Sequence, residues 1–109
     1  MKKAMFSAPM AGRTDAKIDE VRSFARKYLE DRGYEFVNTV FRAEAEYAPD
    51  ALEQSGVKNV PLRYLAGSLE NLSKCDAILF CRGWHDARGC RIEHQAAKDY
   101  GVLILYEEE

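Results

Sequence analysis

The decisive segment is Asp76-Ala77-Ile78-Leu79-Phe80-Cys81-Arg82, in which five consecutive apolar residues lie between a charged residue at each end. Such a run is typical of a central strand that is buried on both faces of a parallel sheet. Downstream of it, Gly83–Gly89 is expected to form a loop that leads into a helix ending at Gly101, and Val102–Tyr106 is expected to form the last strand. Strand, helix and strand in this order make the repeating unit of an α/β fold.

The first third of the chain shows the same alternation. Lys3–Ala8 is a short apolar run that predicts the first strand. Thr14 is a residue type that caps helix N-termini, and apolar residues recur after it at helical spacing until Gly33. Tyr34–Asn38 then predicts the second strand. This third of the chain therefore supplies another strand, helix and strand.

The middle of the chain is the least regular part. Thr39–Val60 is a long polar stretch that predicts a functional or disordered loop with a short helix around Asp50–Gln54. Pro61 is expected to be the first residue of a further helix that ends near Ser73 or Lys74. The apolar face expected to bury that helix carries Leu62, Leu65, Leu69 and Leu72.

Helices that alternate with strands imply right-handed crossovers and a parallel sheet, most simply in the strand order 2-1-3-4. With 109 residues, the chain is expected to form a single domain over residues 1–109. The winding direction changes between strands 1 and 3, so a ligand crevice is expected at their carboxyl ends. The loops Ser7–Arg13 and Gly83–Gly89 meet there, and each opens into a helix N-terminus that favours an anion.

Composition narrows the classes of partner. The chain is 47% apolar and 31% charged, with 16 basic and 18 acidic residues and a net charge of -2. This balance indicates a soluble globular protein and argues against a nucleic acid polymer as partner. No apolar run is long enough to span a bilayer and Met1–Phe6 lacks a signal peptide's features, so no membrane association and a cytoplasmic location are expected.

The three cysteines, Cys75, Cys81 and Cys90, have neither disulfide-framework nor zinc-site spacing, so reduced thiols and no metal are expected. Cys90 lies near a predicted helix N-terminus, where a thiol pKa can fall. No signature of a thiol mechanism accompanies it. A small packed residue is the preferred interpretation.

Glu93 is the residue best placed for chemistry. It shares a helix face with Ala96, Ala97 and Tyr100, so its carboxylate is expected to point inward near the crevice. One interpretation is structural: Glu93 complements the helix N-terminus or pairs with Arg13 or Arg91. The other is catalytic, because a carboxylate can attack an anomeric carbon as a glycosidic bond breaks.

Two loops supply candidate binding residues. The loop Ser7–Arg13 brings small residues, a glycine and a cation to the crevice, which suits a phosphate or sugar hydroxyls, although an ordinary turn with a surface arginine has the same sequence features. Trp84 follows Gly83 at a strand end, where it can stack on a base or cover the rim of the core. The candidate binding residues are Ser7, Pro9, Met10, Gly12, Arg13, Ser68, Gly83, Trp84, Arg88 and Gly89.

Three blocks of the sequence carry a family resemblance. They are Phe6-Ser7-Ala8-Pro9-Met10-Ala11-Gly12, then Cys75-Asp76-Ala77-Ile78, then the segment from Gly83-Trp84 through Gly89-Cys90-Arg91-Ile92-Glu93-His94 to Ala97. In this order they resemble the nucleoside 2-deoxyribosyltransferase-like superfamily, in particular its small bacterial and phage members. The resemblance implies a flavodoxin-like or Rossmann-like three-layer sandwich with four to five parallel strands, a homodimer or larger homo-oligomer, and no cofactor. It also implies chemistry at the N-glycosidic bond of a deoxyribonucleoside or its 5′-monophosphate.

Position by position, the resemblance makes Glu93 the nucleophile and places Ser7, Gly12, Arg13 and Gly89 in the loops that hold the nucleoside or its phosphate. Two departures stand out. Ser68 occupies the position of an aspartate that helps protonate the leaving base, and Ala87 occupies that of a phosphate-binding serine.

A serine is too weak an acid to replace a carboxyl group as proton donor, and such help is typically worth about 10²–10⁴-fold in rate. Asp86 is the candidate substitute as catalytic acid, although a solvated loop carboxylate is the simpler interpretation. Three functions therefore stay open: an enzyme at the N-glycosidic bond, a nucleotide-binding or sensing module without turnover, and a structural homo-oligomer.

Overall fold

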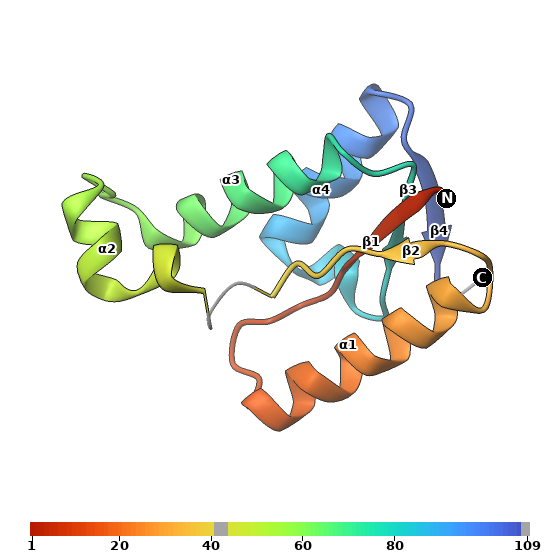
Figure 1. Ribbon diagram of the computed structural model, residues 1–109, viewed down its shortest axis with the longest axis horizontal. Coiled ribbons are helices and arrows are strands. Elements are labelled where there is room, and N and C mark those ends of the chain that lie inside the picture. The colour runs from red at the N-terminus through yellow and green to blue at the C-terminus, as the bar shows by residue number, and fades with distance from the viewer. Residues whose placement is uncertain (41–43, 108–109) are drawn as a thin grey trace.

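A computed structural model describes residues 1–40 and 44–107 of the chain. Along the chain the elements are β1 (Lys3–Ser7), α1 (Asp15–Glu30), β2 (Glu35–Phe36), the 3₁₀ turn η1 (Ala45–Tyr47), α2 (Pro49–Gln54), α3 (Val60–Leu72), β3 (Ala77–Phe80), the 3₁₀ turn η2 (Trp84–Asp86), α4 (Arg88–Asp99) and β4 (Leu103–Tyr106). Figure 1 shows these elements in one view. None of the helices in the described ranges is long and apolar enough to cross a membrane.

The strands form one parallel sheet in the order β2-β1-β3-β4, which confirms the predicted α/β class and strand order. The two central strands pair in register from Ala4 opposite Ala77 to Ser7 opposite Phe80. They therefore end side by side, and the loops that follow them leave the sheet at the same edge.

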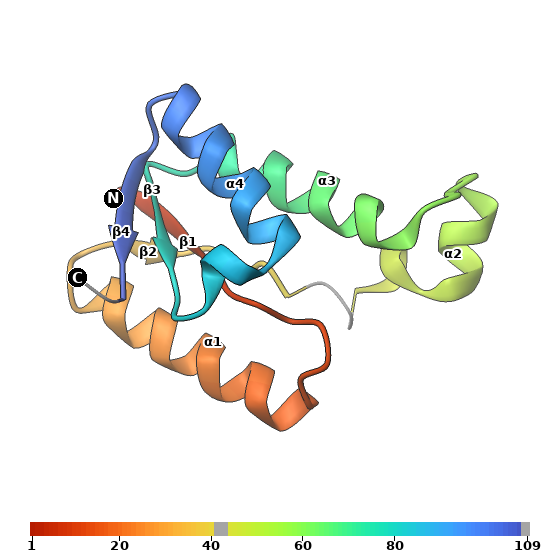
Figure 2. The same ribbon diagram turned by 180° about the vertical axis from the view of Figure 1, so that it is seen from behind.

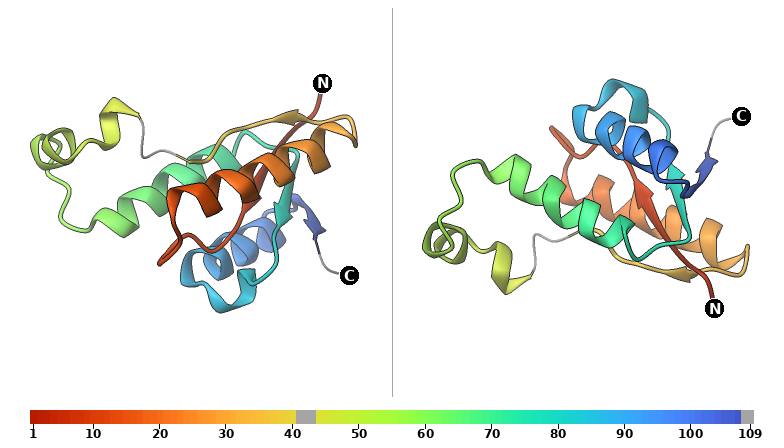
Figure 3. Two further views of the ribbon diagram at one scale, coloured as in Figure 1. Left: turned by 90° about the horizontal axis from the view of Figure 1, so that it is seen from below. Right: turned by 90° about the horizontal axis from the view of Figure 1, so that it is seen from above.

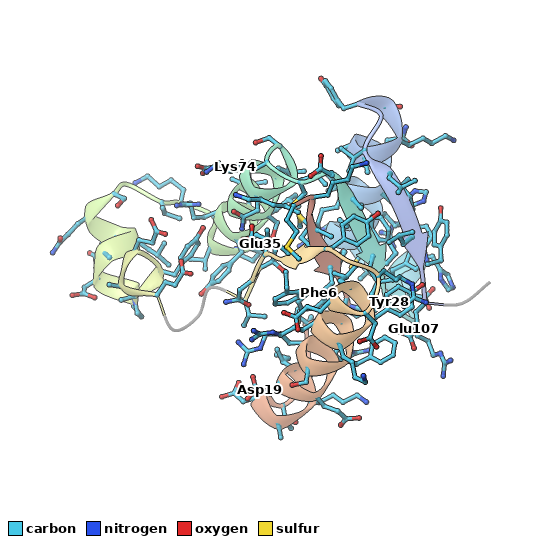
Figure 4. The ribbon with its side chains drawn as sticks, turned by 45° about the vertical axis from the view of Figure 1, so that its right-hand side comes forward. Phe6, Asp19, Tyr28, Glu35, Lys74 and Glu107 are labelled. Atoms are coloured by element: carbon cyan, nitrogen blue, oxygen red, sulfur yellow. The ribbon has the colours of Figure 1, made fainter. Side chains whose placement is uncertain are left out.

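Helices cover both faces of the sheet, so the fold has three layers. Figures 1 and 2 show α1 on one side of the strands and α3 with α4 on the other. Alternate residues of each central strand point to opposite faces. Accordingly, Phe6 and Leu79 pack with Leu29 of α1, whereas Met5 and Ile78 pack on the face of α3 and α4. Figure 4 shows Phe6 between the strands and α1.

The helix starts follow local capping chemistry. Thr14 accepts a hydrogen bond from the Lys17 N–H at the start of α1, as the sequence predicts. Asn59 accepts one from the Leu62 N–H and caps α3, so this helix begins at Val60, one residue before the predicted start at Pro61. Proline fits the first turn because the N–H groups there have no intrahelical partner.

The second strand and the loop after the third strand differ from their predicted extents. The second strand is only Glu35–Phe36 rather than Tyr34–Asn38, because only these two residues pair with β1. The expected loop Gly83–Gly89 is shorter than predicted, since η2 and the start of α4 take up most of it. Glu93 therefore lies in the second turn of α4.

The middle segment forms a small unit of its own. The predicted short helix is present as α2 (Pro49–Gln54), and η1 precedes it. Tyr47 and Leu52 are buried there and pack with Val57 and with Tyr64 of α3. Figure 3 shows this unit at the N-terminal end of α3, away from the sheet. The second half of α3 therefore covers the strands, and its first half extends beyond them. Residues 41–43 of the predicted loop lie outside the described ranges.

Candidate functional site

A cleft of about 880 Å³ opens at the carboxyl ends of β1 and β3, where the strand order predicts a crevice. Its lining comes from the chain after β1, β2 and β3, from one face of α3, and from the first turns of α4. The lining residues are Ala8, Pro9, Met10, Ala11, Thr39, Pro61, Leu62, Tyr64, Leu65, Ser68, Gly83, Asp86, Ala87, Arg88, Gly89, Cys90, Ile92 and Glu93. A cleft of this size is typical of small-molecule sites.

Glu93 is the buried carboxyl group of this cleft. The residue is only 7% exposed, and the Ser7 hydroxyl donates a hydrogen bond of 3.0 Å to its Oε1 atom. Ser7 is the last residue of β1, and its carbonyl oxygen accepts a hydrogen bond of 2.9 Å from the Cys81 N–H. The backbone pairing at the end of β1 and β3 therefore fixes the position of Ser7, and the Ser7 hydroxyl in turn holds Glu93.

Burial raises the pKa of Glu93 to about 7, because a charged carboxylate loses water that the protein only partly replaces. The hydrogen bond from Ser7 acts in the opposite direction, since it stabilises the charged form. Within the described residues, no ion pair joins Glu93 to Arg13 or Arg91, and Arg91 instead donates to the His85 carbonyl at 3.2 Å. The structural interpretation of Glu93 as an ion-pair partner is therefore not supported.

The two carboxyl oxygens of Glu93 have different surroundings. Oε1 accepts the Ser7 hydrogen bond, and no other hydrogen bond to Glu93 is present in the described part of the chain. Among the same residues, every fully buried side-chain oxygen or nitrogen has a partner. Oε2 therefore keeps some accessible surface, and Glu93 lines the cleft. One oxygen is held by the Ser7 hydroxyl, and the other has no hydrogen-bond partner among the described residues.

Most of the predicted site residues line this cleft. With Glu93 they are Pro9, Met10, Ser68, Gly83, Asp86, Arg88 and Gly89. Gly83 has a positive φ of 87°, and a Cβ atom there would lie 3.4 Å from the Pro9 side chain. A side chain at this position would therefore have a strained backbone and would press on Pro9, so glycine lets the two loops lie close together at the sheet edge where they leave the strands.

The other four predicted residues lie outside the lining. Ser7 is buried behind Glu93, and its single O–H is used in the bond to that carboxyl group. Gly12 and Arg13 form the turn before α1, where the Arg13 N–H donates to the Met10 carbonyl at 3.2 Å. Trp84 packs on Phe80 and stacks on the His94 ring at 4.2 Å between centroids. Its ring thus covers the rim of the core, one of the two roles expected for it.

Sequence reasoning missed one wall of the cleft. Leu62 was expected in the core but is 59% exposed, because this part of α3 extends past the sheet and faces the cleft.

Tyr100 was expected to share the inward face of Glu93, but it is 87% exposed at the C-cap of α4. Thr39 was also missed; its hydroxyl donates to the Phe6 carbonyl at 3.3 Å. Its position directly after the second strand could have indicated it.

The cysteine thiols are free, and burial raises their pKa values, to about 11 for Cys90 and about 12 for Cys81. Both thiols are therefore protonated near neutral pH. This agrees with the interpretation of Cys90 as a packed residue. In residues 1–40 and 44–107, no group of three or more His, Cys, Asp or Glu side chains is arranged to hold a metal ion.

Sheet order, helix layers and cleft together define a doubly wound parallel α/β domain with its cleft at the topological switch point. The chain belongs to the family described as Domain of unknown function (DUF4406), whose model matches residues 2–106. No curated protein matches the chain significantly.

Proposed function

We propose that this protein is an enzyme of the nucleoside 2-deoxyribosyltransferase-like type, which cleaves or exchanges the N-glycosidic bond of a deoxyribonucleoside or its 5′-monophosphate. The observation that carries the proposal is Glu93: a buried carboxyl group on the lining of the cleft, with one oxygen held by Ser7 and the other without a hydrogen-bond partner among the described residues. The sequence resemblance in the blocks around Ser7 and Glu93 supports the same chemistry.

In the proposed first step, Oε2 of the Glu93 carboxylate attacks C1′ of the sugar. The new C1′–O bond forms as the C1′–N bond breaks, and the electron pair of the broken bond stays on the base nitrogen, which takes up a proton. In the second step, a ring N–H of another base or a water molecule attacks C1′ and gives its proton back to the group that protonated the leaving base. The C1′–O bond to Glu93 breaks with its electron pair on the oxygen, and the carboxylate returns unchanged. Splitting one substitution into two in this way is the general advantage of a covalent intermediate.

Among the described residues that line the cleft, Asp86 is the one carboxyl group besides Glu93 that can supply the proton for the leaving base. Ser68 also lines the cleft, but a hydroxyl group is a poor proton donor. We therefore assign Asp86, or water held near it, as the proton source. Because the Asp86 side chain is 83% exposed, this help is expected to be weaker than that from an enclosed acid.

The lining of the cleft suggests where the parts of a nucleoside lie. Met10, Leu62 and Leu65 offer apolar surface, which suits the flat faces of a base. Arg88 and the N-terminal turn of α4 supply positive charge, which suits a 5′-phosphate or the polar edge of the sugar.

A binding module without turnover is the second candidate. Two features favour it. The family resemblance places a proton-donating aspartate where this chain has Ser68, and the N-cap of α4 is Ala87, whose methyl group can neither cap the helix nor bind a phosphate. Such a module would sense a nucleoside or nucleotide in the same cleft.

One experiment separates the two candidates. Purified protein is incubated with a panel of deoxyribonucleosides and their 5′-monophosphates, with and without a second free base, and the bases are separated by chromatography. The enzyme releases or exchanges base. A binding module gives no product but raises the melting temperature with at least one member of the panel. Absence of both results would refute both candidates.

A further inference from the structure

Three strands of the sheet end in one row of paired residues, the strand-end row. Ser7 of β1 lies opposite Phe80 of β3, and Phe80 lies opposite Tyr106 of β4. Side chains in register on parallel strands point to the same face of the sheet, and Phe80 packs on the face of α3 and α4. The strand-end row therefore presents a hydroxyl group, a phenyl ring and a phenol to α4.

Two adjacent residues of α4 contact the two ends of this row. Glu93 accepts the 3.0 Å hydrogen bond from Ser7 at one end. At the other end, a hydrogen bond of 2.6 Å joins His94 Nε2 to the Tyr106 hydroxyl, and the His94 ring lies edge-on to Phe80 at 5.0 Å between centroids. Neighbouring side chains on a helix point about 100° apart, so the two hydrogen bonds hold the second turn of α4 from two directions.

His94 also contacts the turn that precedes α4. The Trp84 ring stacks on the His94 ring with 4.2 Å between centroids and 23° between planes. Trp84 is the first residue of η2, the turn that carries Asp86 to the cleft. Through this stacking, the position of α4 is linked to the position of the proposed proton source.

We propose that His94 is a positioning residue of the site: its contacts with the end of β4 and with η2 fix the rotation of α4 that brings Glu93 to Ser7. The cleft lining, in the described part of the chain, does not include His94, so it acts through its neighbours and not on a ligand. The inference concerns the geometry of Glu93 in the folded protein. Its effect on catalysis rests on the proposed function.

A double-mutant cycle between Ser7 and His94 tests this without turnover. The effects of independent substitutions on the unfolding equilibrium constant multiply to within about twofold. If His94 positions Glu93, the bond to Ser7 is already weakened in His94→Ala. Ser7→Ala is then expected to change the constant by at least about threefold less in that variant than in wild type. Urea unfolding of the four proteins at pH 8 gives the comparison.

Phe24→Ala is the matched control for the cycle. Phe24 is a partly exposed aromatic residue that contacts Tyr28 within α1, on the other face of the sheet. Its substitution also removes an aromatic contact, but it leaves α4 and the strand-end row intact. The effects of Phe24→Ala and Ser7→Ala are therefore expected to multiply to within about twofold.

Tyr106→Phe is the milder variant, because it removes the hydroxyl group bonded to His94 and keeps the ring. It is expected to couple to Ser7→Ala in the same direction as His94→Ala and beyond the same limit of about twofold. If His94→Ala does not fold, the cycle with Tyr106→Phe decides.

Kinetics add a second readout that a purely structural role would not move. The apolar wall of the cleft at Met10, Leu62 and Leu65 belongs to other elements, so KM of His94→Ala is expected to stay within about twofold. Its kcat is expected to fall by about 10- to 100-fold, because misplacing a reacting group by about 1 Å can cost about 10²-fold. Phe24→Ala is expected to change neither constant.

Effects of Ser7→Ala that multiply with those of His94→Ala and of Tyr106→Phe would overturn the proposal and leave His94 as packing only. A raised KM with an unchanged kcat in His94→Ala would contradict a role in positioning the nucleophile. Coupling in a protein that releases no base would keep this inference and refute the proposed enzyme, so the two failures are distinguishable.

Discussion

The Ser7 hydroxyl donates a 3.0 Å hydrogen bond to Oε1 of Glu93 and so joins two residues that are 86 positions apart in the chain. Ser7 ends a central strand, and Glu93 lies in the second turn of the last helix. The bond exists because the sheet order brings the end of β1 next to the start of α4. Because of this bond, Oε1 of Glu93 accepts a hydrogen bond from the protein, whereas Oε2 accepts none among the described residues. The proposed nucleophile is Oε2.

Replacing Ser7 by alanine is expected to destabilise the fold. The change leaves Oε1 as a buried acceptor without a partner, which typically costs about 1–3 kcal/mol. Urea unfolding measures this loss. Ser55→Ala is the matched control, because that hydroxyl is exposed at the C-cap of α2 and donates only to the nearby Ala51 carbonyl; its effect is expected to stay within about 0.5 kcal/mol. Equal effects of the two variants would contradict a structural role for the Ser7 bond.

The rate of base release is expected to rise with pH through a midpoint near 7. The proposed nucleophile is the carboxylate, and burial raises the pKa of Glu93 to about 7, so at lower pH most molecules carry the unreactive acid. The measurement is kcat/KM for a deoxyribonucleoside between about pH 5 and 9. A rate that falls with increasing pH over this range would indicate that Glu93 acts as an acid instead.

Glu93→Gln is expected to change how stability depends on pH. The unfolded glutamate loses its proton near pH 4.5, whereas the folded one keeps it up to about pH 7. The folded state therefore binds more protons between these values, and wild-type stability falls there by about 3 kcal/mol relative to the neutral glutamine variant. Unfolding of both proteins at pH 5 and pH 8 tests this. A stability difference that is the same at both pH values would contradict a raised pKa.

Leucines on the same helix are expected to respond differently to truncation. Leu72 is 5% exposed and packs on the sheet, so Leu72→Ala is expected to cost about 2–5 kcal/mol of stability. Leu62 is mostly exposed on the cleft wall, so Leu62→Ala is expected to leave stability within about 0.5 kcal/mol and to raise KM. Thermal unfolding and steady-state kinetics measure the two effects. An unchanged KM in Leu62→Ala would argue against the apolar wall as part of the binding site.

The sequence allowed the layers of the fold to be predicted because its periodicities are local signals. The apolar run at Ala77–Phe80 and the cap at Thr14 identify a central strand and a helix start without reference to the rest of the chain. The sequence indicates the ends of an edge strand less clearly, since the length of that strand depends on how many of its residues pair with the neighbouring strand. The extent of β2 was overestimated for this reason.

Only part of the site could be predicted from the sequence. The inward position of Glu93 follows from helical spacing, but its bond to Ser7 depends on the packing of α4 against the end of β1. A leucine stripe on a helix predicts burial without indicating where the sheet ends, so Leu62 was assigned to the core. The side to which Trp84 turns depends on the His94 and Phe80 rings that it meets. These outcomes are set by tertiary contacts.

The most direct test of the nucleophile compares base release by wild type and by Glu93→Gln at pH 8, where the wild-type carboxylate predominates. Both proteins are first shown to be folded by their cooperative melting, and both are then given the same deoxyribonucleoside. The proposed mechanism predicts base release by wild type and a loss of at least about 10³-fold in the variant, because the amide cannot form the glycosyl intermediate. A Glu93→Gln protein that releases base as fast as wild type would contradict it.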